Sequence, residues 1–200
     1  MFNIYFNEYN LLMGSGGTSY LPFVSGILSA NAKKIPKLKK NFVFKPFIFK
    51  PENSDDIISK YYDVKPHIAV FSISMWNEQL SLKVAKKIKK KYNPLIIFGG
   101  PSCPHNPTEY FRKYKFIDLA VRAEGEDAFN DILLRYLNKE SFHNIPNVAF
   151  RDAKNNCILN LEKYNFNKNL DVYPSPYLSG EFDYLFENKN EHNYQIIIET

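Results

Sequence analysis

Short apolar segments alternate with helical patterns along residues 4–137 of this chain of 200 residues. Each apolar segment has the length of a buried strand, and each stretch that follows carries apolar residues at helical spacing. This alternation predicts a parallel sheet with helices on both faces, because parallel strands need crossover connections. The expected strands are 4–6, 42–49, 68–73, 95–98 and 118–121, and the expected helices are 22–35, 55–62, 77–92, 108–114 and 127–137.

Five parallel strands favour a flavodoxin-like, Rossmann-type α/β fold with three layers, α/β/α, and strand order 2-1-3-4-5. In that order, the loops after strands one, three, four and five open at the same edge of the sheet. Ligands of such folds bind at the carboxyl ends of the strands, next to the point where the strand order reverses. The sequence therefore predicts a ligand-binding crevice at this edge.

Composition limits the class of protein and its surroundings. An apolar content of 44% and an aromatic content of 16% are typical of a globular protein. The apolar runs are too short to span a bilayer, and no signal peptide is recognisable. The two cysteines, Cys103 and Cys157, lie far apart in sequence, which favours a reducing, cytoplasmic location over a disulfide scaffold.

The net charge of +5 raises the question of a nucleic-acid partner. Many of the lysines fall in residues 33–40 and 83–91. In the second group, the helical spacing places the lysines on the solvent face of the expected helix 77–92. Aromatic residues are not interleaved with them as a base-stacking surface requires, so a solvated helix face is the favoured interpretation.

The pattern changes after residue 138, which gives three expected parts. Residues 1–138 form the α/β domain, and residues 139–193 form a hairpin and a proline-rich connector. The hairpin strands are expected at 147–151 and 157–161, and residues 173–183 are expected to be extended. Residues 194–200 begin a new strand for which the sequence suggests no partner.

The loop after the first strand is rich in glycine. A dinucleotide fingerprint would need glycine at position 19, where the chain has Ser19, and a Walker A loop would need a Gly-Lys-Ser/Thr sequence, which is absent. Either the loop is simply flexible or its backbone gives way to a large ligand. Its candidate ligand-binding residues are Gly16, Gly17, Thr18 and Tyr20.

The loops after strands three and four carry the next candidates. The ring of Trp76, the sole tryptophan, could cover a planar cofactor, or it could pack on the helix that it precedes. Gly99 and Gly100 lack a Cβ, so a ligand could touch their backbone. The candidate ligand-binding residues here are Ser72, Ser74, Met75, Trp76, Asn77, Gly99, Gly100 and Pro101.

Charged residues follow the fifth strand in the sequence Arg122-Ala123-Glu124-Gly125-Glu126. Acidic residues at the start of a helix interact favourably with its dipole, which is a structural role. The same groups could also form hydrogen bonds with amide or hydroxyl groups of a ligand. Glu124, Gly125 and Glu126 complete the candidate ligand-binding residues, and the sequence offers no candidate catalytic or metal-ligating residue.

Residues 71–77, 96–101, 119–126 and 174–183 together resemble the N-terminal cobalamin-binding domain of B12-dependent radical SAM enzymes. The resemblance covers nearly the whole chain and implies cobalamin (vitamin B12) as the cofactor. It also implies that Gly99 and Gly100 lie along the nucleotide tail of cobalamin. The Gly-Glu-Gly-Glu-like motif of the family, with Ala123 in place of its first glycine, implies that residues 123–126 mark the same edge of the site.

The resemblance further implies a longer enzyme. In the family, a strand like 194–200 begins a radical SAM barrel and precedes a Cys-x-x-x-Cys-x-x-Cys motif, which holds a [4Fe–4S] cluster for S-adenosylmethionine chemistry. This sequence has no such motif, so we expect it to bind B12 but not to cleave S-adenosylmethionine by itself. The expected partner is a radical SAM barrel on the same polypeptide, and the expected activity of the whole is methyl transfer or a ring rearrangement.

Many cobalamin proteins supply a histidine to cobalt through an Asp-x-His-x-x-Gly motif. The residues two places before the four histidines are Lys65, Cys103, Ser141 and Asn190, so none of the histidines belongs to that motif. The resemblance therefore implies base-off binding without a histidine ligand, with the lower face of cobalt against residues 74–77.

Two other functions remain open at the level of sequence. A flavodoxin-like electron-transfer module could hold the phosphate of FMN at residues 16–19 and stack its ring on Trp76. An interaction domain without a ligand is the second. A phosphorylated receiver domain is not favoured, because Asn7, Glu8 and Ser72 stand where its acidic residues would be needed.

Overall fold

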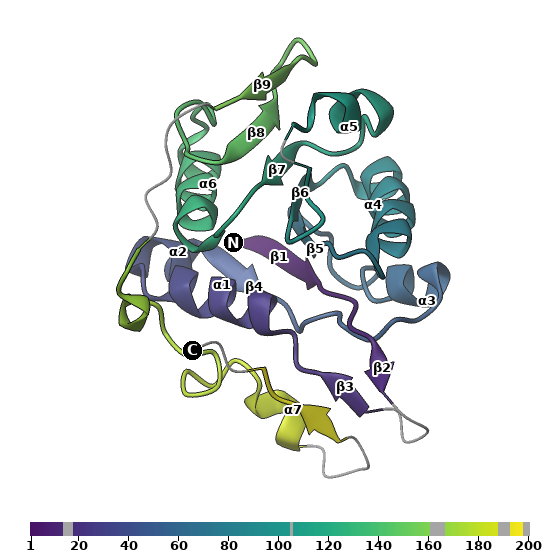
Figure 1. The fold of residues 1–200 in the computed structure, drawn as a ribbon, viewed down its shortest axis with the longest axis vertical. Coiled ribbons are helices and arrows are strands. Elements are labelled where there is room, and N and C mark those ends of the chain that lie inside the picture. The colour runs from purple at the N-terminus through teal and green to yellow at the C-terminus, as the bar shows by residue number, and fades with distance from the viewer. Residues whose placement is uncertain (14–17, 105, 161–166, 188–192, 198–200) are drawn as a thin grey trace.

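A central sheet forms the middle of the molecule in the computed structural model, which describes residues 1–13, 18–104, 106–160, 167–187 and 193–197 (Figure 1). Its strand order is β4-β1-β5-β6-β7-β8-β9, and the first five of these pair in parallel. The predicted order 2-1-3-4-5 is therefore confirmed. The strands are β1 Phe2–Asn7, β4 Phe42–Phe44, β5 Ile68–Ser72, β6 Leu95–Gly99, β7 Leu119–Val121, β8 Val148–Arg151 and β9 Cys157–Leu159.

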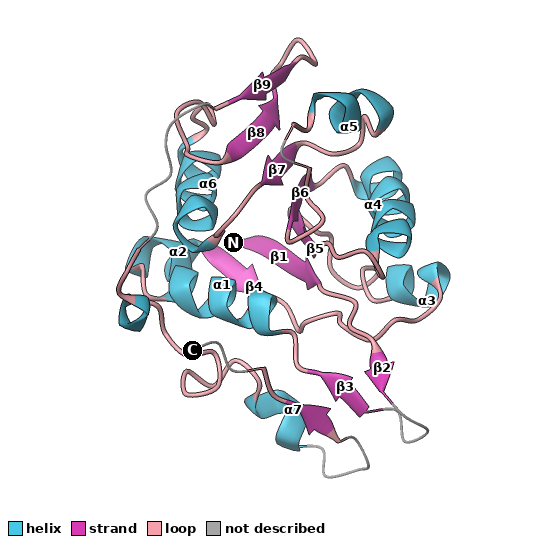
Figure 2. Ribbon diagram, viewed as in Figure 1, coloured by secondary structure: helices cyan, strands magenta, loops and turns pink. Residues whose placement is uncertain are grey.

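Helices cover both faces of this sheet, which makes the fold a three-layer, flavodoxin-like α/β fold (Figure 2). The helices on one face are α1 Phe23–Lys33, α2 Pro36–Asn41 and α6 Glu126–Asn138, and those on the other are α3 Ser54–Ser59, α4 Glu78–Tyr92 and α5 Thr108–Lys113. Helix α2 was not expected, although Pro36 occupies its first turn, a common helix-start signal. The cap of α3 is Asn53, whose Oδ1 accepts from the backbone N–H groups of Asp55 and Asp56.

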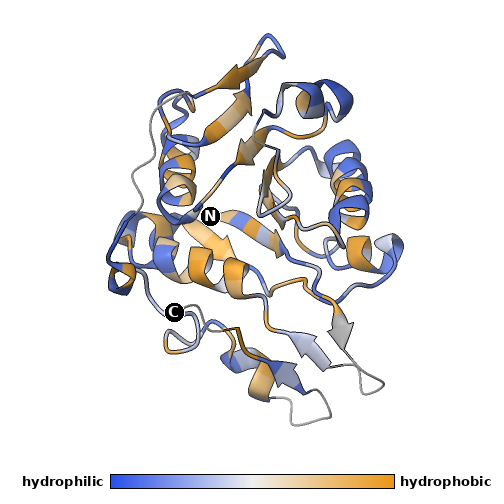
Figure 3. Cartoon of the chain, viewed as in Figure 1, coloured by the Kyte–Doolittle hydropathy of each residue, from blue (hydrophilic) through white to orange (hydrophobic). Residues whose placement is uncertain are grey.

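Alternating side chains along each strand build two separate hydrophobic cores. In β1, Ile4 and Phe6 belong to the core beneath α1 and α6, whereas Tyr5 belongs to the core beneath α3 and α4. Figure 3 shows the apolar strands at the centre and the polar outer surface of α4. Helix α1 is apolar over much of its length, because it is covered on its outer side as well.

The expected hairpin after α6 is confirmed, and it extends the main sheet. Strands β8 and β9 pair antiparallel, and β8 pairs antiparallel with β7. The sheet therefore has seven strands within the described residues, two more than the five that the alternation pattern predicts. The division of the chain at residue 138 stays a prediction.

A second, three-stranded sheet lies apart from the first (Figure 1). It joins β2 Leu12–Met13, β3 Thr18–Tyr20 and β10 Tyr194–Gln195, with β10 parallel to β3. The expectation that residues 194–200 begin a strand without a partner is therefore wrong for Tyr194 and Gln195. The partner lies far away in sequence, within the loop that follows β1.

The segment before β10 folds back onto α1. Residues 176–182 form consecutive turns, in which the backbone N–H of Glu181 donates to the carbonyl of Pro176, so the expectation that residues 173–183 are extended is wrong there. A short 3-10 helix, Leu170–Val172, precedes the turns and α7 Asp183–Glu187 follows them. The Lys33 Nζ lies 2.8 Å from the nearly buried carboxylate of Glu181, which ties this segment to α1.

At Gly26, α1 packs closely against that segment. A Cβ at position 26 would lie 2.5 Å from Cζ of Phe182 and 2.8 Å from Cβ of Pro176. We expect Gly26→Ala to lower the free energy of unfolding by about 1–3 kcal/mol through overpacking. Urea unfolding would measure the change. Helix propensity alone predicts that the variant is more stable, since alanine is a better helix former than glycine. A rise in the free energy of unfolding would therefore contradict this close packing.

Among the described residues, no helix is long and apolar enough to cross a membrane.

Candidate functional site

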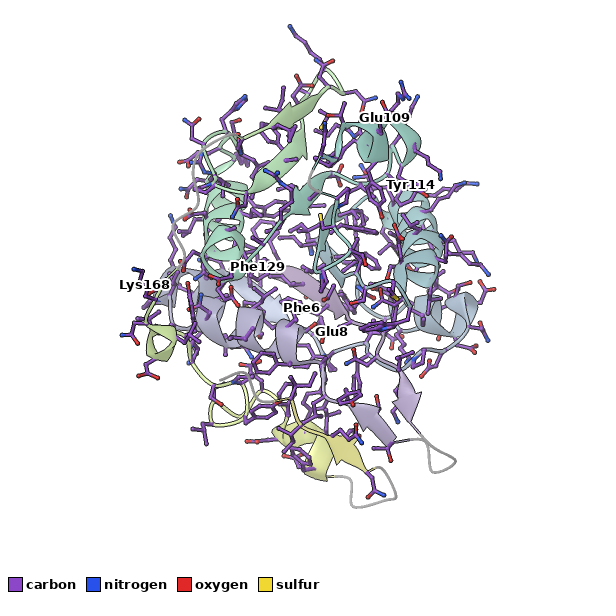
Figure 4. The ribbon with its side chains drawn as sticks, viewed as in Figure 1. Phe6, Glu8, Glu109, Tyr114, Phe129 and Lys168 are labelled. Atoms are coloured by element: carbon purple, nitrogen blue, oxygen red, sulfur yellow. The ribbon has the colours of Figure 1, made fainter. Side chains whose placement is uncertain are left out.

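A cavity of about 460 Å³ opens at the carboxyl edge of the parallel strands, between α1, α6 and the sheet. Except for Ser25, its fully buried side chains are hydrocarbon. The rings of Phe6, on β1, and Phe129, on α6, pack with their centroids 5.5 Å apart, and Figure 4 labels both. The buried apolar lining is Phe6, Leu28, Val70, Phe71, Ile97, Val121 and Phe129.

The more exposed part of the lining is polar and rich in glycine. It comes from the ends of β5, β6 and β7 and carries seven of the fifteen candidate residues predicted from the sequence. These lining residues are Ser72, Gly99, Gly100, Pro101, Arg122, Glu124, Gly125 and Glu126. The cavity thus has an apolar interior and a polar opening, which is the usual form of a small-molecule site.

The candidates on the loop after β5 lie at the same edge but do not line the cavity. The buried amide of Asn77 holds this loop, because its Nδ2 donates to the carbonyls of Tyr9 and Ser72 and its Oδ1 accepts from the N–H of Ser74. Trp76 donates from Nε1 to the carbonyl of Tyr9 at 3.2 Å and is 53% exposed. Met75 is 84% exposed. Trp76 and Met75 therefore present apolar surface to solvent.

Two of the four candidates on the loop after β1 belong to the described residues. Gly16 and Gly17 fall outside the described residues. Thr18 and Tyr20 belong to β3 and do not line the cavity. The carbonyls of Tyr20 and Leu21 accept from Nδ2 of Asn10, so the two ends of this loop are held together at its base.

The three glycines of the lining differ in why the chain carries glycine. Gly100 has φ +105°, and a Cβ there would lie 2.6 Å from the carbonyl oxygen of Ile73, so its own backbone requires glycine. Gly99 and Gly125 have no positive φ, and a Cβ at either position would make ordinary contacts of 3.6 Å or more. The absence of a side chain at Gly99 and Gly125 therefore leaves space in the cavity without serving the fold.

Helix α1 forms one wall of the cavity through Val24, Ser25 and Leu28, and none of these was predicted from the sequence. A buried carboxylate fixes the first turn of this helix. The Glu8 Oε2 accepts hydrogen bonds of 2.8 Å from both the N–H and the Oγ–H of Ser25. Burial raises the pKa of Glu8 to about 7, and hydrogen bonds from Ser25, Val24 and Asn10 oppose that rise.

Cys103 also lines the cavity, and burial raises the pKa of its thiol to about 12. The thiol is therefore neutral near pH 7 and behaves as a small apolar group. Within the parts of the chain that the structure describes, no group of three or more His, Cys, Asp or Glu side chains could hold a metal ion.

Two solved structures are similar to this chain in fold. The enzyme OxsB, described as a cobalamin-dependent S-adenosylmethionine radical enzyme with aqua-cobalamin bound, superposes on 99% of this chain with a TM-score of 0.74 and 19% identity. TsrM from Kitasatospora setae, a radical S-adenosylmethionine methyltransferase with cobalamin and a [4Fe–4S] cluster bound, covers 78% of this chain with a TM-score of 0.58 and 9% identity. The flavodoxin-like α/β fold is shared with both.

Sequence relatives are of the same kind. The cobalamin-dependent radical SAM methyltransferase TokK of Streptomyces tokunonensis is 30% identical over 170 residues, or 82% of this chain. The 2-(S-pantetheinyl)-carbapenam-3-carboxylate methyltransferase of Streptantibioticus cattleyicolor is 26% identical over 173 residues, or 86% of this chain. No protein-family model matches the chain.

These matches confirm the resemblance to B12-dependent radical SAM enzymes that the sequence motifs predict. The chain spans about a quarter of the length of the two sequence relatives, 24% of TokK and 25% of the carbapenam methyltransferase.

Proposed function

We propose that this chain binds cobalamin at the cavity between α1 and α6, and that it is the cofactor-binding part of a radical SAM methyltransferase. The observation that carries the proposal is the cavity itself. It lies at the carboxyl edge of the parallel strands and is widened by Gly99 and Gly125, which the fold does not require. Similarity to TokK, which its name describes as cobalamin-dependent, supports cobalamin as the ligand.

The size and polarity of the cavity suggest which part of cobalamin it holds. Its volume of about 460 Å³ lies in the range of sites for small ligands, roughly 300–1,000 Å³. An aromatic base and its ribose suit this volume and the buried lining of Phe6, Val70, Ile97 and Phe129, whereas the corrin macrocycle is too broad to enter. The nucleotide tail therefore occupies the cavity, and the corrin lies outside it at the edge of the sheet.

The proposed corrin position adjoins the loop after β5. This loop presents Met75 and Trp76 to solvent, and its backbone is held by the buried Asn77. The lower face of the corrin would rest against residues 74–77, which offer no histidine to cobalt. With the base of cobalamin withdrawn into the cavity, binding is base-off. Bound cobalamin would supply a metal centre that accepts and donates a methyl group.

The rest of the proposed enzyme lies outside this chain. S-adenosylmethionine, a [4Fe–4S] cluster and a radical SAM barrel belong to the proposal for the whole protein. TsrM is described with cobalamin and a [4Fe–4S] cluster bound, which supports this assignment.

Titration of the purified chain with hydroxocobalamin tests the proposal. We expect a saturable change in the visible spectrum, with the absorbance of a base-off corrin that lacks a nitrogen ligand on its lower face. FMN, added in a parallel titration, should cause no change. Binding of FMN without cobalamin would instead indicate an electron-transfer flavodoxin, and binding of neither would indicate an interaction domain. Either result would reject the proposal.

The indole of Trp76 supplies a second prediction. We expect Trp76→Ala to weaken cobalamin binding about fivefold to tenfold, since an exposed aromatic side chain at the corrin edge contributes contact area. Trp76→Phe is the matched control. It keeps an apolar ring but loses the N–H that donates to the carbonyl of Tyr9, so it should bind nearly as well as the unchanged chain. Equal affinity of all three proteins would place the corrin away from this loop.

A further inference from the structure

We infer that Gly99 and Gly125 make the cavity selective for the base of the nucleotide tail. The cavity admits a flat, apolar heterocycle such as dimethylbenzimidazole and discriminates against a polar purine such as adenine. This inference rests on the proposed function, because it names which cobamides the proposed site accepts.

Gly99 and Gly125 both lie next to the side chain of Val121. A Cβ at Gly99 would lie 3.8 Å from Cβ of Val121, and a Cβ at Gly125 would lie 3.9 Å from Cγ1 of Val121 and 3.6 Å from Cδ2 of Leu28. Both glycines line the cavity: Gly99 is the last residue of β6, and Gly125 directly precedes α6. They therefore leave open the space on two sides of Val121, at a boundary between α1 and the sheet.

The backbone conformation at Gly99 and Gly125 does not require glycine. Gly125 has φ −107°, which any residue can adopt, and Gly99 ends a regular strand. Gly100, in contrast, has a positive φ and faces backbone atoms of Ile73. A methyl group at Gly99 or Gly125 would occupy cavity space without disturbing a neighbour, so ligand size is the property that these two positions control.

The buried lining of the cavity is almost entirely apolar. Among the described lining residues, Ser25 carries the only buried hydroxyl, and its hydrogen is donated to Glu8 at 2.8 Å. The other fully buried lining side chains are hydrocarbon, and the buried polar atoms of the lining, Nε of Arg122 and Oε2 of Glu126, belong to its polar opening. In the interior lined by Phe6, Val70 and Phe129, the amino group of a purine would lose its hydrogen bonds to water and meet only hydrocarbon, which disfavours binding. The methyl groups of dimethylbenzimidazole suit this apolar lining.

Three ligands and three variants test the inference by absorbance titration. The ligands are cobalamin, the adenine-containing cobamide and cobinamide, which has the corrin but no nucleotide base. The proteins are the unchanged chain, Gly99→Ala and Gly125→Ala, with Lys90→Ala on the exposed surface of α4 as a control. The unchanged chain should bind cobalamin about tenfold or more tightly than the adenine cobamide.

Each glycine variant should lose about tenfold or more in cobalamin affinity, the effect of one methyl group in an apolar site, and keep its cobinamide affinity. Retained cobinamide binding also shows that the variant is folded. Equal affinity of the unchanged chain for both bases, unchanged cobalamin affinity of both variants, or an equal loss for cobinamide would overturn the inference while cobalamin binding itself stands. If the unchanged chain binds none of the three ligands, the proposed function fails, and the inference with it.

Discussion

Gly100→Ala is expected to lower the free energy of unfolding by about 3 kcal/mol or more. An L side chain at φ +105° is strained by roughly 1–3 kcal/mol, and the added Cβ would lie 2.6 Å from the carbonyl oxygen and 2.9 Å from the nitrogen of Ile73. Both are backbone atoms, so no rotamer change relieves the contact. The loops after β5 and β6 would have to separate, although two backbone hydrogen bonds join them there, from Ile73 to Gly99 and from Ser102 to Ile73.

Gly99→Ala is the matched control for this prediction. The same methyl group added one residue earlier meets Val121 at 3.6 Å or more, and we expect the stability to change by less than about 1 kcal/mol. Urea unfolding of the two variants beside the unchanged chain measures both effects. Similar stability of the two variants would show that the positive φ of Gly100 and its contact with Ile73 are not what this turn requires.

The parallel part of the fold could be predicted from the sequence because local patterns determine it. Segments such as 95–98 are continuous apolar runs, and the helix after each run shows its spacing, so the strand order follows from alternation and from known handedness. The pairing of Tyr194 with Ser19 could not be predicted in this way, since it joins residues far apart and both strands are very short. The turns over α1 were missed for a related reason, as prolines indicate only that regular structure ends.

The candidate site could be predicted only in part. Gly99, Gly125 and Ser72 were found because residues at or just after the carboxyl ends of parallel strands meet at one edge. Phe6, Ile97 and Phe129 were not, because a cavity-lining hydrocarbon has the same sequence pattern as a core residue. Gly99 and Gly100 also look equivalent in the sequence, and only the atoms near each Cβ show that Gly100 serves the backbone and Gly99 leaves space.

Glu8 shows how a buried charge can remain hidden in a sequence. It follows β1 directly, where a carboxylate is usually exposed or binds a ligand, yet it is 6% exposed and its Oε2 holds the first turn of α1. The N-terminus of a helix favours the carboxylate, but burial has the larger effect, so the pKa of Glu8 is raised to about 7 from its usual 4.5. The ionised form is therefore disfavoured in the folded chain relative to the unfolded chain.

The raised pKa predicts how stability depends on pH. The folded chain keeps a proton on Glu8 up to about pH 7, whereas the unfolded chain loses it near pH 4.5. This group's contribution to stability is therefore fully present below pH 4.5 and is lost as the pH rises through 7. Between pH 5 and pH 8, we expect the loss to be about 2–3 kcal/mol, since each pKa unit corresponds to about 1.4 kcal/mol.

Glu8→Gln isolates this contribution from the other titrating groups. The amide is neutral at every pH, and its oxygen can still accept the hydrogen bonds of Ser25. The difference in unfolding free energy between the unchanged chain and the variant should therefore shift in favour of the variant by about 2–3 kcal/mol from pH 5 to pH 8. Urea unfolding at several pH values measures this difference. A difference that stays constant, or that shifts toward the unchanged chain, would mean that the helix N-terminus and Ser25 outweigh burial, so that Glu8 is ionised throughout and acts as a charged cap of α1.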